Sequence, residues 1–520
     1  MKMLKLCMAL LLCVFFSACQ KSNSHANVIT VQVFDRGTDG GKTDPTNNMW
    51  TNWIKQKVLE DENIIVSFVP VPRNEDTQTL NNLIAAGSAP DICYTYSTEL
   101  INNYGEMGGI FDIAPYVDTL LKDYDAFLGA DPNLHGERLI YRGKDPETGV
   151  LYMIPGRYIY TASQNLFIRK DWLDKLGLTL PKTKEEYYDA LVAFKEKDPG
   201  NVGKNRVIPF SMTTDVRWTG GIIVDPFIDP YLSPEERWIN TANERNILLP
   251  GYKEGFRFLN TMYNNGLIDR DFPLYRDDKT LENLVKSGLV GSFAHNWDQI
   301  YRDNTKILEE LQKNVPGADL VPIDAIQSID GVTRKRGSPP ISLFWFIPKT
   351  SKNPEAAIRY MNWLSRFENY NFLQFGYEGV NHEIVNGIPK ILQVTGPWIQ
   401  NSAGNGDYAI NLNGYDLGDA DLNIQALANS YKWPPEMIIN AYKISSTNAE
   451  SPPFVQAKLL AAVPYQQTLA DKSLVIYTET VTARPGNFDR VWDNAVKDWL
   501  ASGAQAIINE RREKYLRQQQ

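Results

Sequence analysis

The chain contains almost no cysteine or histidine, with four residues of each type among 520. Three of the cysteines, Cys7, Cys13 and Cys19, lie at the very beginning, so Cys93 is the single thiol in the rest of the chain. A single thiol cannot close an internal disulfide, and a hydrophobic core must therefore hold the fold. The four histidines are scattered. They form no Cys/His metal spacing, and no Gly-x-Ser-x-Gly, His-Glu-x-x-His or phosphate-loop motif occurs.

The chain also lacks an excess of basic residues. It has 53 Lys and Arg against 62 Asp and Glu, which gives a formal net charge of −9. A surface that follows phosphates needs a basic excess, so we expect no nucleic acid among the partners. The length after the first few tens of residues is sufficient for two or more domains.

Long hydrophobic runs are absent except near the start, where Leu6 to Phe16 is apolar. This run is too short for a permanent membrane helix. Lys2 and Lys5 precede it, and a basic residue pair followed by a short apolar run is typical of a secretory signal. The sequence therefore predicts that residues 1–18 are a signal peptide that is removed.

The segment Phe16-Ser17-Ala18-Cys19 resembles the lipobox of bacterial lipoproteins, in which the cysteine receives diacylglycerol and becomes the mature N-terminus. We expect Cys19 to be the lipid attachment site. Residues 19–27 would then form a polar linker on the extracellular face of the cell membrane. Two acyl chains, such as palmitate, are sufficient for stable anchoring. The alternative is ordinary cleavage after Ala18, which leaves Cys19 as a plain thiol.

Strand and helix patterns alternate after this linker. A second unit of the same kind starts near Gln164, with a strand at 165–168 and a helix that ends near Lys197. The pattern is typical of an α/β protein with an open sheet, whose ligands gather beyond the carboxyl ends of the strands. In the first unit we predict strands over 28–33, 64–71 and 91–96, and helices over 49–62 and 77–86.

Several segments together resemble the extracellular solute-binding proteins of carbohydrate ABC importers. In the first of them, Pro90 stops a helix and Asp91 opens the next strand. The last two resemble the subfamily of large lipoproteins that import complex or uronate-bearing oligosaccharides. The segments are, in order, Leu83–Ile92, Leu151–Pro155, Leu166–Gly177 with Pro181–Tyr187, Gly288–Gly291 with His295–Trp297, Pro354–Trp363, and Phe375–Val380.

The resemblance implies a two-lobed periplasmic-binding-protein-like fold of type II with a hinge between the lobes. Lobe 1 would hold 28–161 with 330–400, and lobe 2 would hold 162–329 with 401–520. It further implies a monomer, without catalytic activity or cofactor, that captures an oligosaccharide between the lobes and delivers it to ABC transporter permeases. Two alternatives stay open: a secreted polysaccharide-degrading glycosidase or lyase, which needs paired carboxylates, and a lipoprotein that presents a ligand to a sensor kinase.

The ligand-binding candidates follow from the chemistry of sugars. Pyranose rings stack an apolar face on aromatic side chains, and their hydroxyls need polar partners. Most Trp residues pack inside proteins, and Trp345, within Leu343–Phe346, fits the core of a strand better than a cleft position, which stays the alternative. An acidic sugar would favour arginines, because a guanidinium binds a carboxylate bidentately. The candidates are Asp35, Arg36, Tyr96, Arg157, Tyr158, Arg217, Trp218, Trp297, Asp298, Trp345 and Glu378.

One departure from the resembled family concerns metal. Many of its members carry a calcium loop of the form Asp-x-Asp-Gly-Asn-Gly-x-x-Asp-Glu, and the corresponding stretch here is residues 198–207. Gly200 and Val202 offer no side-chain oxygen, and Arg206 places a cation where an anion is needed. We therefore expect no metal at this loop, with Arg206 pairing to Asp198 instead.

Overall fold

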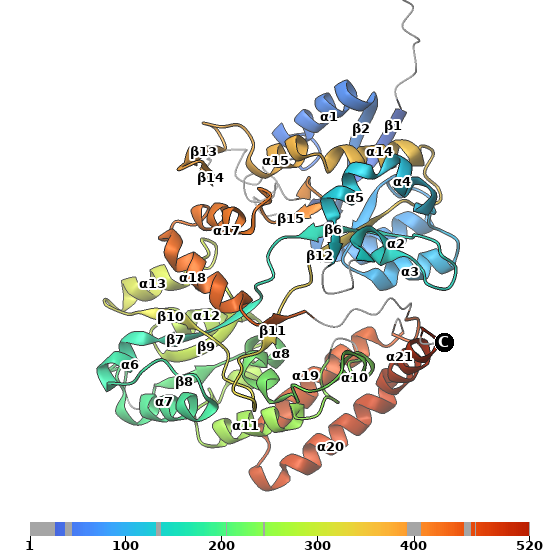
Figure 1. Cartoon of the computed structure of the whole chain (residues 1–520). Coiled ribbons are helices and arrows are strands. Elements are labelled where there is room, and N and C mark those ends of the chain that lie inside the picture. The colour runs from blue at the N-terminus through green and yellow to red at the C-terminus, as the bar shows by residue number, and fades with distance from the viewer. Residues whose placement is uncertain are drawn as a thin grey trace, which may run out of the picture.

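The computed structural model describes residues 27–36, 44–131, 137–203, 205–242, 245–392, 407–451, 459–462 and 464–518. The predicted signal peptide and the lipid attachment site Cys19 lie outside these ranges. The chain forms two α/β lobes, one above the other in Figure 1, which confirms the predicted fold class. Within the described ranges, no helix combines the length and the apolar character that crossing a membrane would require.

The sheet of lobe 1 has the strand order β2-β1-β3-β12-β6-β15. The parallel pair β1-β2 joins the rest through a parallel bridge between Val31 and Ile92, and β12 runs antiparallel to both of its neighbours. The strands are β1 (Asn27–Asp35), β2 (Ile64–Pro72), β3 (Cys93–Thr95), β6 (Ile154–Tyr158), β12 (Ile341–Phe346) and β15 (Leu412–Asn413). The helices are α1 (Met49–Glu62), α2 (Asp76–Ala85), α3 (Thr98–Glu106), α4 (Val117–Leu120), α5 (Lys122–Leu128), α14 (Pro354–Leu364) and α15 (Phe367–Phe375).

Local signals explain why the predicted elements of lobe 1 form where they do. The side chain of Asn48 accepts hydrogen bonds from the amides of Trp50 and Thr51, which caps the N-terminus of α1. Asn63, in the left-handed conformation, ends the same helix. The predicted strand-helix-strand-helix-strand opening is confirmed, with ends that differ from the prediction by one or two residues.

Lobe 2 is built on the sheet β10-β7-β9-β8, in which β8 and β9 are parallel and β7 is antiparallel to both of its neighbours. Side chains alternate between the two faces of β7: Leu166 and Ile168 enter one core, and Phe167 enters another. Helices therefore cover both faces of this sheet. The strands are β7 (Gln164–Arg169), β8 (Ile208–Ser211), β9 (Val290–Asn296) and β10 (Leu320–Ile323).

The helices of lobe 2 come from two distant parts of the chain. Thr183 caps the N-terminus of α7 through a capping box with Glu186, and the helix ends at Lys197 as predicted. Those from the first part are α6 (Lys170–Leu176), α7 (Lys184–Lys197), α8 (Val216–Thr219), α9 (Gly221–Val224), α10 (Pro234–Ile239), α11 (Tyr252–Asn264), α12 (Asp278–Lys286) and α13 (Ile307–Asn314). Those from the second part are α17 (Ala420–Asn429), α18 (Pro435–Ser446), α19 (Gln466–Thr482), α20 (Phe488–Trp499) and α21 (Gln505–Gln518).

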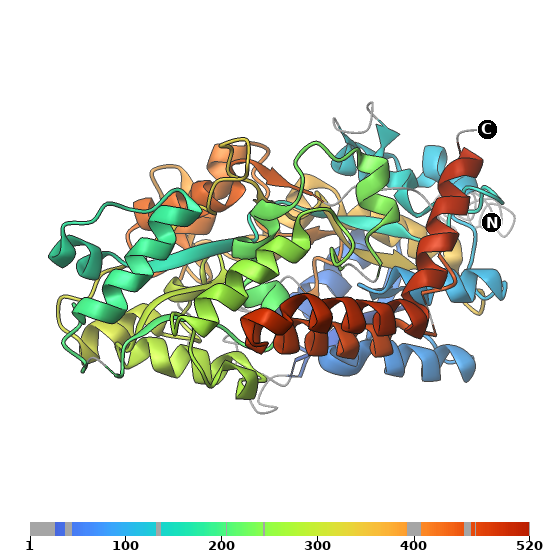
Figure 2. The same cartoon turned by 90° about the horizontal axis from the view of Figure 1, so that it is seen from below.

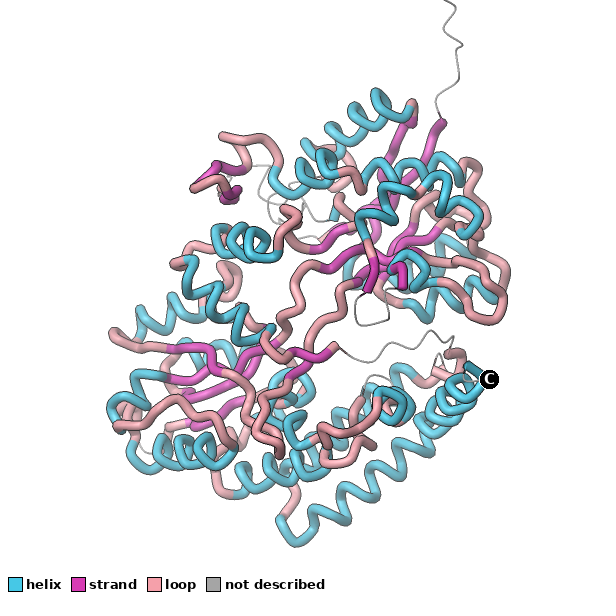
Figure 3. Tube along the Cα trace, viewed as in Figure 1, coloured by secondary structure: helices cyan, strands magenta, loops and turns pink. Residues whose placement is uncertain are grey.

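Several crossings connect the lobes, and Figure 3 shows them as pink loop segments between the two sheets. One leads from β6 to β7, one from β11 (Lys335–Arg336) to β12, and one from β15 to α17. Short strands outside the main sheets are β4 (Ala130–Asp131), β5 (Glu137–Arg138), β13 (His382–Val385), β14 (Ile388–Ile391) and β16 (Ala449–Glu450).

The packing assigns one stretch differently from the sequence prediction. Tyr408, Ala409, Ile410 and Leu412 belong to the hydrophobic core of lobe 1, whereas the prediction placed everything after residue 400 in lobe 2. The reason is that β15 adds to the edge of the lobe 1 sheet beside β6 before the chain crosses. The remaining lobe boundaries stay a prediction.

The C-terminal helices belong to lobe 2 but reach towards lobe 1. Figure 2 shows α20 along the underside and α21 turning beside the blue helices of lobe 1. The turn needs Gly503, which has φ 126°, and a Cβ there would come within 2.2 Å of the Tyr465 ring. Near the end of α21, Lys514 forms an ion pair with Glu147 of lobe 1.

Candidate ligand site

A cavity of about 310 Å³ lies between the lobes. Its walls include Phe34, Arg36 and Tyr96 from the strand ends of lobe 1, Tyr415 from a crossing, and Leu427 from α17 of lobe 2. A volume of this order is typical of small-molecule sites, which combine apolar walls with a few polar groups. The cavity brings together the predicted residues Arg36 and Tyr96.

The polar groups of the lobe 1 wall follow the carboxyl ends of β1, β2 and β3, which meet at one edge because the three strands are parallel. Arg36 follows β1. Its guanidinium donates two hydrogen bonds of 2.6 Å to the carboxylate of Asp407. These bonds raise the pKa of Arg36. Asp407 is nearly buried, so the pair fixes the orientation of Arg36 and neutralises its charge.

Arg73, which the sequence analysis did not name, follows β2 at the same edge. Its guanidinium carbon lies 4.8 Å from the ring centroid of Phe34 and 4.7 Å from that of Tyr96. These distances are within the range of cation–π contacts. Tyr96 is 42% exposed, so its ring reaches solvent at the mouth of the cavity. The signal that could have found Arg73 is its position, since it follows a parallel strand as Arg36 does.

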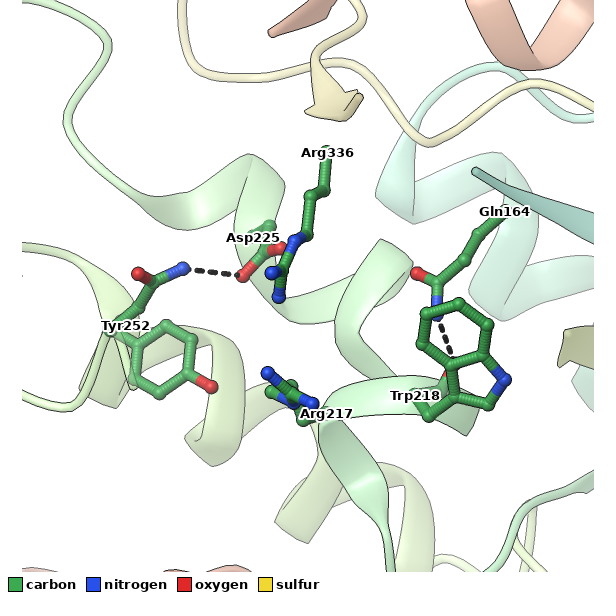
Figure 4. A pocket seen from close by; sticks show the side chains of 7 residues that line it. Gln164, Arg217, Trp218, Asp225, Tyr252 and Arg336 are labelled. Carbon is green, nitrogen blue, oxygen red and sulfur yellow. Dashed lines mark hydrogen bonds between the residues drawn. The ribbon is translucent and has the colours of Figure 1, made fainter. Parts of the chain in front are cut away.

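A second, much smaller space of about 10 Å³ lies inside lobe 2. The predicted residues Arg217 and Trp218 line it, and Figure 4 shows Arg217, Arg336 and Tyr252 converging on the space beside Asp225. Surrounding protein atoms withdraw the carboxyl of Asp225 from water, and this burial raises its pKa to about 6. The space holds about one water molecule and not a sugar ring.

Trp218 is the partly exposed aromatic side chain of this region. Its ring meets His295 edge-on with centroids 6.3 Å apart, and its carbonyl accepts a hydrogen bond of 2.6 Å from the Gln164 amide. It lies in α8, beyond the carboxyl end of β8. Its position as a sugar platform stays a prediction.

The predicted pair Trp297 and Asp298 is packed inside lobe 2. Trp297 is 8% exposed and meets the Tyr442 ring edge-on at 5.5 Å. The Asp298 carboxylate accepts hydrogen bonds from Arg302 at 2.9 Å and from the Tyr431 hydroxyl at 2.6 Å. Both residues are therefore engaged by protein groups in this structure.

Arg157 and Tyr158 end β6, where the chain begins to cross. The guanidinium of Arg157 donates to Asp416 at 2.9 Å and to the carbonyl of Phe127 at 3.2 Å. Asp416 lies in the crossing that follows β15, so this pair ties two crossings together. Tyr158 is partly buried, and burial raises the pKa of its hydroxyl. Asp35, the last residue of β1, is also partly buried.

Two candidates lie away from the cavity. Trp345 is 0% exposed and donates a hydrogen bond of 2.9 Å to the Tyr124 hydroxyl within the lobe 1 core. Its prediction as a ligand residue is wrong, because it points to the covered face of β12. Glu378 is exposed in the turn before the β13–β14 hairpin and lines neither cavity.

The loop at 198–207 keeps its turn without the predicted ion pair. The two carboxylate oxygens of Asp198 accept hydrogen bonds from the amides of Val202 at 3.0 Å and Gly203 at 2.9 Å. Arg206 is exposed and forms no ion pair with any described residue, so its predicted pairing with Asp198 is wrong. Backbone amides satisfy the carboxylate instead. Among the residues the structure describes, no group of three His, Cys, Asp or Glu is placed to hold a metal ion.

The fold and the inter-lobe cavity define a two-lobed solute-binding protein. A sequence profile of the bacterial extracellular solute-binding protein family matches residues 50–369. The chain belongs to this family. This match confirms the resemblance seen in the sequence.

Curated relatives include two proteins of Bacillus subtilis strain 168. The chain is 25% identical over 373 residues to the polygalacturonan/rhamnogalacturonan-binding protein YtcQ, covering 67% of this chain and 70% of YtcQ. It is also 25% identical over 337 residues to the lipoprotein LipO, covering 61% of each. Both are binding proteins or lipoproteins by name, and neither name describes an enzyme.

Solved structures share the fold over nearly the whole chain. The alginate-binding protein AlgQ2 superposes with a TM-score of 0.61 at 19% identity, covering 95% of this chain and 98% of AlgQ2. The substrate-binding protein FusA of Streptococcus pneumoniae in complex with kestose gives 0.63 at 17% identity, covering 95% and 99%. At these identities the likeness concerns the fold.

Proposed function

We propose that this protein is a lipid-anchored extracellular substrate-binding protein that captures an oligosaccharide between its lobes and delivers it to the permeases of an ABC importer. The cavity between the lobes carries the proposal. Arg36 and Tyr96, from the ends of parallel strands, form part of its wall and supply the polar and aromatic groups that sugar recognition requires. Binding would close the lobes about the crossings, of which the segment 158–164 is one.

The relatives support the choice of ligand and anchor. YtcQ carries polygalacturonan and rhamnogalacturonan in its name, FusA was solved with kestose, and LipO is a lipoprotein. The motif around Cys19 fits the same anchor. We propose a monomer that acts without covalent chemistry, and therefore without a catalytic carboxylate pair.

The ligand is tested by thermal unfolding of the chain from Gln20 onward, alone and with a panel of neutral and acidic oligosaccharides. A ligand that binds only the folded state raises the unfolding midpoint by mass action. We expect a rise with at least one sugar class and intact sugars in the mass spectrum afterwards. Shortened sugars would instead indicate a glycosidase or lyase.

The anchor is tested with the full chain expressed in a bacterial host. Wild type should fractionate with membranes and carry acyl chains, whereas Cys19→Ala should be released or remain unprocessed. A Cys93→Ala variant is the matched control, because Cys93 is buried in lobe 1 and should leave fractionation unchanged. Equal membrane association of wild type and Cys19→Ala would overturn the anchor.

A further inference from the structure

Two arginines share one aromatic ring at the edge of the cavity. The guanidinium carbon of Arg36 lies 6.0 Å from the centroid of Phe34, and that of Arg73 lies 4.8 Å from the same centroid. Phe34 is buried and fixed, so it acts as a common support for both cations. The two arginines differ in how their charge is compensated.

Arg36 has a carboxylate partner, and Arg73 has none among the described residues. The carboxylate of Asp407 accepts two hydrogen bonds from the guanidinium of Arg36. Arg73 makes no hydrogen bond or ion pair with any residue that the structure describes, and its contacts are the faces of Phe34 and Tyr96. The nearby carboxylate of Asp76 is engaged by the Thr95 hydroxyl at 3.0 Å. Among the residues that the structure describes, Arg73 therefore has no carboxylate that compensates its positive charge.

The aromatic contacts hold the guanidinium without using its donors. An aromatic face attracts the cation but accepts none of the N–H groups that lie in the guanidinium plane. Five donors in a rigid fork stay available, and this fork matches a carboxylate bidentately. Arg73 does not itself line the cavity, but it lies over the partly exposed ring of Tyr96, which does, so the fork lies next to a wall residue of the cavity.

We propose that Arg73, held between Phe34 and Tyr96, binds the carboxylate of an acidic sugar, so that the ligand of this protein is a uronate-bearing oligosaccharide. The proposal rests on the proposed function. Arg73 would bind the carboxylate of the uronate ring. The ring of Tyr96 would stack against the apolar face of that ring or of the next sugar. A chain with a net charge of −9 repels anionic sugars at long range, so such a ligand needs a local uncompensated cation.

The test compares matched sugars by calorimetric titration. Trigalacturonate and trimannuronate are each measured beside the carboxyl-reduced trisaccharide, which has the same linkage and no charge. We expect wild type to bind one of the acids at least about tenfold more tightly than its reduced form. Arg73→Gln should lose about 10- to 100-fold for the acid and leave the reduced form unchanged, and Arg73→Lys should recover part of the loss.

Arg270→Gln is the matched control. Arg270 is exposed in lobe 2 and lies 5.5 Å from the centroid of Tyr263, so it has the same chemistry away from the cavity. It should not change any affinity. The unfolding midpoint of Arg73→Gln without sugar should stay near that of wild type, which shows that the variant folds.

The outcomes separate the two proposals. Equal binding of the acidic and reduced sugars, or an equal loss for both in Arg73→Gln, overturns the carboxylate site and leaves oligosaccharide capture standing. If only neutral sugars such as fructo-oligosaccharides bind, the carboxylate site is likewise overturned and oligosaccharide capture still stands. If no sugar of the panel binds, oligosaccharide capture fails and the carboxylate site fails with it.

Discussion

The two lobes carry similar residues beyond the carboxyl ends of their strands and use them differently. In lobe 1, Arg36 and Tyr96 line the cavity, and Arg73 lies against the ring of Tyr96. In lobe 2, Trp297 and Asp298 occupy the corresponding place after β9, but they pack against Tyr442 and pair with Arg302. The local pattern of an aromatic and a charge after a strand is the same.

The difference shows what decides whether such a pattern can meet a ligand. Beyond β9 the second part of the chain returns as α17 and α18 and covers the loop, so its polar groups find partners within the lobe. Beyond β2, the contacts that the structure describes for the Arg73 guanidinium are the rings of Phe34 and Tyr96, both from lobe 1. A side chain that follows the carboxyl end of a strand can therefore contact a ligand only where segments from distant parts of the chain do not cover it.

The largest effect is expected from the buried aromatic of lobe 1. Trp345→Ala removes a fully buried indole and its hydrogen bond to Tyr124, and should lower the free energy of unfolding by about 3–5 kcal/mol. Chemical denaturation measures this. A loss below about 1 kcal/mol would show that the face of β12 is less tightly packed than the structure indicates.

Trp218 in lobe 2 tests how a partly exposed tryptophan differs from the buried Trp345 of lobe 1. Because its ring is partly exposed, Trp218→Ala should cost less stability than Trp345→Ala, but it should weaken sugar binding about tenfold, or about 1.4 kcal/mol. Titration and denaturation of both variants separate the two roles. Unchanged affinity with a large loss of stability would assign Trp218 to packing.

The buried carboxyl of lobe 2 predicts a pH dependence. Burial raises the pKa of Asp225 from 3.8 to about 6, so the folded state holds the proton more tightly than the unfolded state does. Its contribution to the free energy of unfolding should therefore fall as the pH rises from 3.8 to about 6, and stay low above that.

Asp225→Asn removes this titration, so the difference in stability between the variant and wild type should grow with pH across the same window. Denaturation midpoints of both proteins from pH 4 to pH 8 measure it. A constant difference would mean that neighbouring arginines keep the carboxylate charged in the folded state throughout.

The smallest effect is expected where the two lobes touch. The ion pair between Lys514 of α21 and Glu147 joins lobe 2 to lobe 1 at the surface. Glu147→Gln should change the free energy of unfolding by only about 0.2–1 kcal/mol, since exposed pairs contribute little. A larger change, or a change in sugar affinity, would show that α21 restrains the movement of the lobes.

Several features were within reach of the sequence because they depend on near neighbours. The strand and helix patterns placed the five predicted elements that open lobe 1, and the strand β7 of lobe 2, to within two residues of their observed ends. The positions of Arg36 and Tyr96 followed from their place after strands. Arg73 satisfied the same rule and could have been named from its place after the second strand, whereas its contacts with Phe34 and Tyr96 needed the tertiary structure.

The sequence by itself determined the alternation of elements, the order of the family motifs and the kinds of side chain that end each strand, since these depend on local propensity and periodicity. Only the tertiary structure decided which of those side chains are covered. Trp345 is enclosed because chain segments far apart in the sequence meet at its strand, and among the described residues Arg73 has no carboxylate partner. Burial and charge pairing are properties of such long-range contacts, and no local pattern encodes them.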